Sequence, residues 1–343
     1  MEVANRRLEA QGLAGPRLGT VDSVVDRLLA IQAQDPRGAR LAVRSRLEDP
    51  AGEARASIVD EALNSRRLVI GWLNRGTLHL VRSEDYHWLH ALTAPRQATA
   101  NRTRLRQEGV SEEQAERGVG LIVKRLADGP ATRNELRDLL EAKGIPVAGQ
   151  AMVHLLYLAS IRGLIVRGPM AGKDQAFVLV RDWLGEPEEF DPEVRLPELA
   201  RRYLVGHGPA SDRDLAAWAG ITLGQARKGL EAVAGELTER DGLMELKGRA
   251  EPPAATAIRL LGGFDPLLHG WAKRDWIVPD ASERGVVTTN GLFRPTILAG
   301  ERIVGTWTMP GGRVELKPFG DLGGGTVKSL EDESRRVVDY LAG

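Results

Sequence analysis

One motif occurs twice in this sequence, and the repeat limits the possible folds more than any other feature. The pattern G-P-A-[ST]-x-x-[DE]-L begins at Gly129 and again at Gly208. In each copy a hydroxyl residue, Thr132 or Ser211, stands three residues before an acid, which is the pattern of a helix N-cap with a capping box. The chain therefore contains at least two copies of one unit, each with a helix beginning at the same place.

Both copies are embedded in the same succession of predicted elements. A helix precedes the motif, a short helix follows it, a longer helix comes after a turn, and β segments close the unit. Three helices closed by a β-hairpin are typical of the winged-helix form of helix-turn-helix. The helices are predicted over residues 121–127, 134–141 and 150–162, then 199–205, 213–218 and 225–237; the strands over 164–167, 176–180 and 243–246. The loop predicted over residues 168–175 carries one positive charge, Lys173.

The two ends of the chain differ from this repeat. The first 110 residues predict a divergent third unit: a helix capped by Thr20, helices over 39–47 and 54–65, a strand over 76–81 and a helix from Ser83. Residues 291–318 alternate apolar and polar side chains and predict three antiparallel strands of a small barrel. Residues 323–325 are all glycine and predict a flexible connector to a last helix over 330–341.

Composition excludes several classes of protein. The chain has 343 residues, no cysteine, and 47 basic against 47 acidic residues. Disulfides, thiolate metal sites and Fe–S clusters are therefore ruled out. No apolar run is long enough for a membrane span, and the N-terminus lacks the apolar core of a secretory signal, so we expect a cytoplasmic protein.

The neutral total argues against a nucleic-acid partner, but the charges are unevenly placed. Residues 95–106 carry four arginines and no acid, whereas residues 111–116 are acidic. Only a local basic stripe matters for phosphate contacts. The competing interpretation is a helix with a solvated basic face, and the segment alone does not choose between them.

Standard catalytic and metal signatures are absent from the sequence. His87 and His90 share a predicted helix face with Glu84, but no further clear ligand is nearby, so packing or solvated histidines are favoured over a metal site. We expect no metal and no cofactor.

A different candidate follows the first long helix. Gln32 and Gln34 flank one alanine where the apolar helix face ends, and Gln32 is predicted to continue that face into the interior or a cleft. A buried amide requires hydrogen-bond partners. From spacing alone the favoured interpretation is that both amides cap backbone groups, with Asp35 and Pro36 forming the turn.

The sequence resembles the AlkZ/YcaQ family of winged-helix DNA glycosylases. The resemblance covers nearly the whole chain and is carried by Gln32-Ala33-Gln34, by the run from Arg75 to Val81, by the loop over 168–175, and by Phe264-Asp265-Pro266-Leu267-Leu268 leading into residues 290–295. This chain has the Gln-x-Gln form of the motif rather than the Gln-x-Asp form of another branch.

The resemblance implies an α+β, mainly helical fold with three tandem winged-helix units and a small C-terminal antiparallel β-barrel. The expected domains are 1–115 with the glutamine motif, 116–185 with the hairpin wing, 186–250, and 251–343. The implied activity is that of a monofunctional DNA glycosylase acting on N7-alkylated purines in duplex DNA. Some members unhook interstrand crosslinks made by genotoxic natural products, in repair or in self-resistance.

The resemblance also assigns roles to residues. Gln34 is expected to hold the attacking water and Gln32 to orient the sugar or the water, or the reverse. Expected DNA contacts come from Arg37, Arg75, Thr77, His79 and Lys173. The partner is duplex DNA, and a monomer is expected. Two alternatives remain: a non-catalytic winged-helix DNA-binding protein or transcriptional regulator, and a protein–protein scaffold.

Overall fold

The computed structural model describes residues 2–49, 51–187 and 191–343, and it divides into two compact units. Unit 1 combines the N-terminal segment up to Val59 with everything from Arg195 onward, and unit 2 is Asp60–Val194. Helix α4 (Ser57–Asn64) crosses the boundary between them. Within the described ranges, no helix is both long and apolar enough to cross a membrane.

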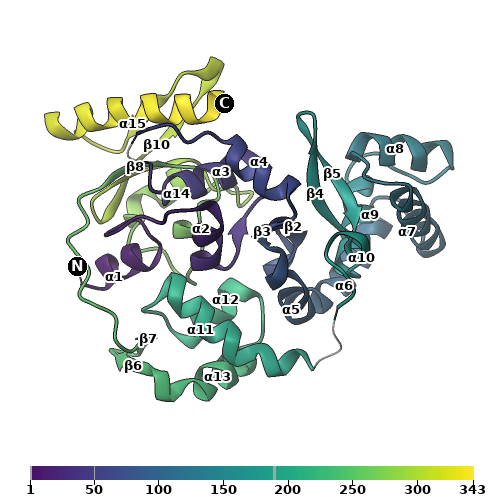
Figure 1. Cartoon of the computed structure of the whole chain (residues 1–343), viewed down its shortest axis with the longest axis horizontal. Coiled ribbons are helices and arrows are strands. Elements are labelled where there is room, and N and C mark those ends of the chain that lie inside the picture. The colour runs from purple at the N-terminus through teal and green to yellow at the C-terminus, as the bar shows by residue number, and fades with distance from the viewer. Residues whose placement is uncertain (1, 50, 188–190) are drawn as a thin grey trace. The chain divides into compact units, whose positions relative to one another are not determined.

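Unit 1 contains helices from both ends of the chain, a four-stranded antiparallel sheet and a separate two-stranded hairpin (Figure 1). Thr20 caps α2 with a capping box, as predicted, and Ser211 and Asp214 do the same for α12. The helices are α1 (Glu2–Ala10), α2 (Val21–Leu28), α3 (Pro36–Arg44), α11 (Leu196–His207), α12 (Asp212–Ala219), α13 (Leu223–Ala232), α14 (Glu283–Val286) and α15 (Gly324–Ala342). The strands are β1 (Ile31–Gln32), the hairpin β6 (Leu237–Arg240) and β7 (Leu243–Leu246), and β8 (Ile258–Leu261), β9 (Thr296–Ala299), β10 (Arg302–Thr308) and β11 (Glu315–Pro318).

The C-terminal strands form an open sheet and not the predicted closed barrel. In the described residues their order is β11-β10-β9-β8, all antiparallel, so the sheet keeps two free edges. Helix α15 packs along β8 (Figure 1). The predicted flexible connector is also wrong in part, because Gly324 and Gly325 form the first turn of this helix.

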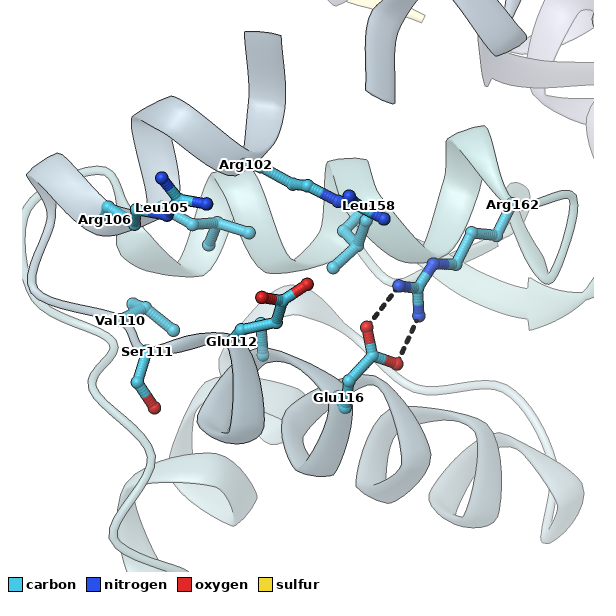
Figure 2. Close-up of a pocket in the computed structure, with 10 residues that line it drawn as sticks. Arg102, Leu105, Arg106, Val110, Ser111, Glu112, Glu116, Leu158 and Arg162 are labelled. Atoms are coloured by element: carbon cyan, nitrogen blue, oxygen red, sulfur yellow. Dashed lines mark hydrogen bonds and ion pairs between the residues drawn. The ribbon is translucent and has the colours of Figure 1, made fainter. Parts of the chain in front are cut away.

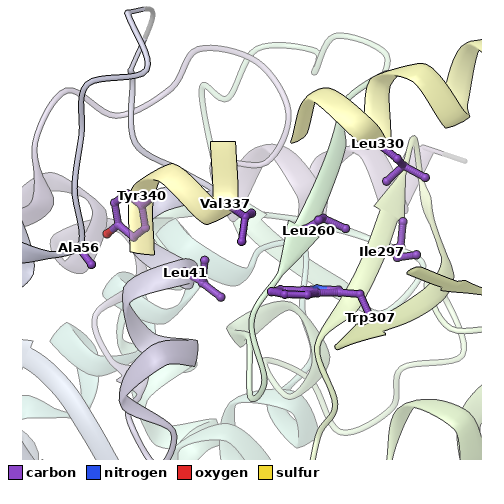
Figure 3. Close-up of a cluster of buried hydrophobic side chains, with 8 residues drawn as sticks. All are labelled: Leu41, Ala56, Leu260, Ile297, Trp307, Leu330, Val337 and Tyr340. Carbon is purple, nitrogen blue, oxygen red and sulfur yellow. The ribbon is translucent and has the colours of Figure 1, made fainter. Parts of the chain in front are cut away.

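The core of unit 1 lies between this sheet, α3 and α15. Figure 3 shows side chains from all three converging around the Trp307 ring. The Trp307 indole N–H donates to the Leu261 carbonyl at 2.9 Å, which satisfies its one buried donor. The fully or nearly fully buried members are Leu41, Ala56, Leu260, Ile297, Trp307, Leu330, Val337 and Tyr340.

Unit 2 holds the first copy of the repeat. Thr132 caps α8 and pairs with Glu135 in the predicted capping box. The four strands of this unit lie in the order β3-β2-β4-β5. Its helices are α5 (Ser83–Thr93), α6 (Ala98–Gln107), α7 (Glu112–Ala127), α8 (Arg133–Ala142), α9 (Ala151–Ile161) and α10 (Val180–Trp183), and its strands β2 (Leu68–Trp72), β3 (Leu78–Arg82), β4 (Ile165–Ala171) and β5 (Asp174–Leu179).

The hairpin β4–β5 is longer than the sequence predicts. Residues 168–175 are not a loop: β4 continues to Ala171 and β5 begins at Asp174, so only Gly172 and Lys173 turn the chain. A register shift between Arg167 and Met170 absorbs Gly168 and Pro169 as a bulge, the usual place for a proline within a sheet.

Candidate functional site

The two glutamines lie between α2 and α3, on a strand and a turn. Leu29 has a left-handed φ of 62°, which ends α2, so Gln32 does not continue the apolar face of that helix as predicted. Gln32 instead lies in β1 and is 6% exposed. Gln34 follows in the turn and is exposed. One amide is therefore nearly enclosed by protein while the other faces solvent.

Neither glutamine caps a helix. Among the described residues, the side chains of Gln32 and Gln34 make no hydrogen bond, so the capping interpretation is wrong. The cap is Asp35, whose carboxylate accepts a hydrogen bond from the Arg37 backbone N–H at 3.0 Å, with Pro36 in the first turn of α3. A nearly buried amide without a protein partner is costly unless water or a ligand satisfies it.

Three glycines fix the backbone that carries this motif. A Cβ on Gly38 would lie 2.1 Å from the Gly263 carbonyl oxygen, and a Cβ on Gly262 would lie 2.8 Å from Gly38 Cα. The first turn of α3 therefore touches the chain that leaves β8, a distance that no larger residue permits. Asp35 caps the N-terminus of α3 and directly follows the glutamine motif. The contact between the glycines therefore also fixes the position of the backbone that carries Gln32 and Gln34.

We expect Gly38→Ala to destabilise unit 1 by about 2–3 kcal/mol. The change improves helix propensity by up to about 1 kcal/mol, but the new methyl overlaps a backbone carbonyl and overpacking dominates. Urea unfolding of both proteins measures the difference. Gly325→Ala in α15 is the matched control: its Cβ meets nothing within 4 Å, so it should be neutral or stabilising. Equal effects of the two changes would contradict the packing argument.

Arg37 extends from the first turn of α3 and is exposed. In the described part of the chain its guanidinium makes no ion pair. Gln32, Gln34 and Arg37 therefore lie within six residues of unit 1, and the last two are exposed.

Unit 2 brings together Arg75, Thr77 and His79. Arg75 lies in the short 3-10 turn Asn74–Gly76 with a left-handed φ of 56°. The Thr77 hydroxyl donates to the Asn74 carbonyl at 3.2 Å, and His79 Nδ1 lies 2.9 Å from the Thr77 carbonyl oxygen. Thr77 and His79 therefore stabilise the turn that presents Arg75, and His79 is only 2% exposed.

His79 is neutral at physiological pH. Burial, and secondarily the positive charge of Arg75, lower the pKa of His79 to about 3, and the bond to the Thr77 carbonyl opposes this. A neutral imidazole that donates from Nδ1 leaves Nε2 as an acceptor.

Acid should consequently destabilise the protein through His79. Because its folded-state pKa is depressed, its contribution is complete above the unfolded pKa of 6.5 and is lost as pH falls from 6.5 towards 3. We expect an added slope of about 1.4 kcal/mol per pH unit in that window. Chemical denaturation between pH 7 and pH 4 measures it, and His79→Gln should flatten the profile. An unchanged slope in the variant would show that other groups carry the acid sensitivity.

Lys173 stands at the tip of the β4–β5 hairpin and is exposed. The left-handed φ of 65° at Gly172 allows the tight turn that presents it. A positive charge at the end of a protruding hairpin suits insertion into a groove of a nucleic acid.

The basic segment 95–106 is faced by acids from a neighbouring helix. Figure 2 shows Arg102 and Arg106 of α6 opposite Glu112 and Glu116 of α7. Glu116 makes a two-bond ion pair with Arg162, one bond being 2.8 Å, and this pair with nearby Arg102 lowers the pKa of Glu116. The pocket there measures only about 20 Å³. Two of the segment's four arginines therefore line a small pocket together with acidic side chains.

Of the two histidines considered for metal binding, His90 has another partner, whereas the buried Nε2 of His87 has none among the described residues. His90 Nε2 lies 3.0 Å from the Ser160 carbonyl oxygen, and burial lowers the pKa of His90. Across the residues described, no group of three or more His, Cys, Asp or Glu residues is placed to hold a metal ion.

Sequence reasoning missed a buried ion pair that supports the site. Arg46 and Asp265 are both completely buried and joined by two hydrogen bonds of 2.8 and 3.0 Å. Arg46 also donates to the Gln11 side chain and backbone and to Ala42 and Ser45, so every N–H is used. Asp265 in turn caps the short helix that begins at Pro266. A lone acid inside the apolar run Phe264–Leu268 was the available signal.

Comparisons with known proteins agree with the resemblance seen in the sequence. The model of the family "DNA glycosylase AlkZ-like" matches residues 25–340. A curated relative from Streptomyces sahachiroi, an interstrand DNA cross-link repair glycosylase, is 29% identical over 97% of this chain and 94% of its own length.

A solved structure, the Streptomyces sahachiroi DNA glycosylase AlkZ, superimposes with a TM-score of 0.79 at 26% identity, covering 99% of this chain and 95% of that one. The matched range covers residues of both units. The chain belongs to the AlkZ-like DNA glycosylase family.

Proposed function

We propose that this protein is a monofunctional DNA glycosylase that hydrolyses the N-glycosidic bond of N7-alkylated purines in duplex DNA. The observation that carries the proposal is the pair of amides at Gln32 and Gln34, unpaired within the described residues and held in place by a rigid glycine contact. Membership of a DNA glycosylase family supplies the reaction class.

Side-chain amides are suited to catalysing the loss of an N7-alkylated purine. An N7-alkylated purine is already cationic, so it departs without a proton from a general acid. The C1′–N9 bond breaks, its electron pair neutralises the base, and the sugar develops oxocarbenium character. Partial negative charge directed at the sugar, together with a positioned water, lowers the barrier. The water oxygen bonds to C1′ and its proton passes to solvent.

Each glutamine is assigned a part in that step. Exposed Gln34 accepts a hydrogen bond from the attacking water, and the oxygen of nearly buried Gln32 orients the sugar or the water; the two assignments can be exchanged. Asp35 is excluded as the base in this proposal because its carboxylate caps α3. No cofactor takes part, and the product is an abasic site with intact strands.

Binding to the duplex is assigned to both units. Arg37 and Arg75 contact phosphates, Thr77 and His79 act on the lesion strand through the turn that they stabilise, and Lys173 enters a groove. The same proposal includes three tandem winged helices, domain boundaries after residues 115, 185 and 250, and a monomeric state.

The lesion class extends to bulky adducts and interstrand crosslinks. The support is the curated relative, whose name states interstrand cross-link repair. Either general repair or self-resistance to a genotoxic natural product accommodates this activity.

The test is base release from a duplex that contains one N7-methylguanine. We expect free N7-methylguanine by mass spectrometry and strand breaks only after alkali. A non-catalytic regulator predicts instead high affinity for one undamaged sequence and no released base. A scaffold predicts no salt-dependent DNA binding.

A further inference from the structure

Four arginines in unit 1 surround one buried glutamate, away from the glutamine motif. Arg44 ends α3, Arg259 lies on β8, Arg336 lies on α15 with Glu333, and Arg17 precedes α2. Arg17, Arg44, Arg336 and Glu333 line one pocket, and Arg259 interacts electrostatically with all of them. Elements distant in the sequence therefore bring four positive charges to one place.

The carboxylates at this place are already used. Glu333 accepts two hydrogen bonds from Arg44, at 2.8 and 3.0 Å, and a third from the Leu260 backbone N–H at 3.2 Å. Asp49, the other acid in the pocket, accepts from the backbone N–H groups of Glu53 and Ala54 at 2.9 and 3.2 Å. Three arginines of the pocket, with the charge of Arg259 nearby, thus face two anions whose oxygens are largely occupied.

The remaining arginines have donors to spare. Arg259 gives one hydrogen bond, to the Ile258 carbonyl at 2.7 Å, while its Nε is buried and has no partner in the described structure. Arg17 donates to the Leu47 carbonyl at 2.9 Å, and within the described ranges Arg336 makes no ion pair. Burial and the neighbouring guanidinium groups lower the pKa of Arg17, and that of Arg259 to about 10. Uncompensated positive charge is therefore concentrated here.

We propose that Arg17, Arg44 and Arg336 form a phosphate-binding site of unit 1, and that the nearby charge of Arg259 strengthens it. Guanidinium groups match phosphate oxygens bidentately. The pocket measures about 30 Å³, enough for oxygen atoms of an anion and too little for an organic ligand. Helix α3 rises about 12 Å from its first residue, Pro36, which follows the glutamine motif, to Arg44 at the pocket. A DNA phosphodiester as the source rests on the proposed function, whereas phosphate binding itself does not.

The experiment uses the full chain and two matched variants on α15. Arg336→Gln removes a pocket charge from an exposed position, and Arg335→Gln removes an exposed charge that pairs with Asp332 outside the pocket. The first arm compares the Tm in inorganic phosphate with the Tm in sodium chloride at equal ionic strength. The second arm measures affinity for an undamaged duplex as a function of salt. Arg17→Gln, a second pocket variant that lies outside α15, is measured in both arms.

Phosphate should raise the Tm of the wild type and of Arg335→Gln by about 2–4 °C, and that of Arg336→Gln by less than half as much. A salt slope that falls by about one for Arg336→Gln but not for Arg335→Gln identifies a DNA phosphodiester as the source. Stabilisation with equal slopes identifies free inorganic phosphate as the ligand. The absence of both a phosphate-specific Tm rise and a selective loss of slope would overturn the site, even in a protein that excises N7-methylguanine.

Discussion

The Gln32→Ala, Gln34→Ala double variant should lose about 10²–10³-fold in the single-turnover rate of N7-methylguanine release. Removing one preorganised group that stabilises transition-state charge typically costs this much. DNA affinity should change less than threefold, because neither amide carries a charge that contacts phosphate. Excision under enzyme excess measures the rate, and fluorescence anisotropy on an undamaged duplex measures the affinity.

Asp35→Asn is the control for that result. An asparagine at this position still caps α3, but it cannot take a proton from water. If Asp35 acts only as the cap, its variant excises within about threefold of the wild type. Loss of activity in Asp35→Asn with full activity in the glutamine variant would transfer the catalytic role to the carboxylate.

Asp265→Ala should produce the largest loss of stability, about 3–5 kcal/mol, because it leaves the completely buried Arg46 guanidinium without its counter-ion. The substitution also removes the cap of the helix at Pro266. For a unit of this size we expect the Tm to fall by about 8–15 °C. Differential scanning calorimetry resolves the transition of unit 1.

Asp332→Ala is the matched control for Asp265→Ala. It breaks the exposed ion pair with Arg335 on α15, and exposed pairs contribute less than about 1 kcal/mol. A similar fall in Tm for both variants would contradict the assigned importance of the buried pair.

The repeat and its helix starts could be predicted because their signals are local. The capping boxes at Thr132 and Ser211 depend on side chains three residues apart, and the structure has both. Strand β2 was missed because all five of its residues are buried, so it lacks the alternation by which a half-buried strand is detected.

The errors at the site have a common cause, which is tertiary contact. Gln32 was placed on a helix face because the apolar spacing runs on through Leu29, but Leu29 turns left-handed and ends α2. Gly38 looked unremarkable because its partner, Gly263, is more than 200 residues away in the sequence. The role of Asp265 likewise depends on Arg46, which is distant in the sequence. Local patterns therefore located the motif, while distant contacts determined its geometry.

The distribution of charge on the folded chain could not be predicted from local sequence either. The basic segment at residues 95–106 is opposed by Glu112 and Glu116 across the pocket of Figure 2. Arg17, Arg44, Arg259 and Arg336 instead come together from elements that no sequence window contains. A neutral total is thus compatible with a concentrated phosphate site.

The most direct test of the central claim compares two lesions in one duplex sequence, cationic N7-methylguanine and uncharged hypoxanthine. An enzyme that relies on amides and lacks a general acid should release N7-methylguanine, leave hypoxanthine in place, and lose the first activity when Gln32 and Gln34 are replaced. Failure of the wild type to release N7-methylguanine, or equal release of both bases, would contradict the account.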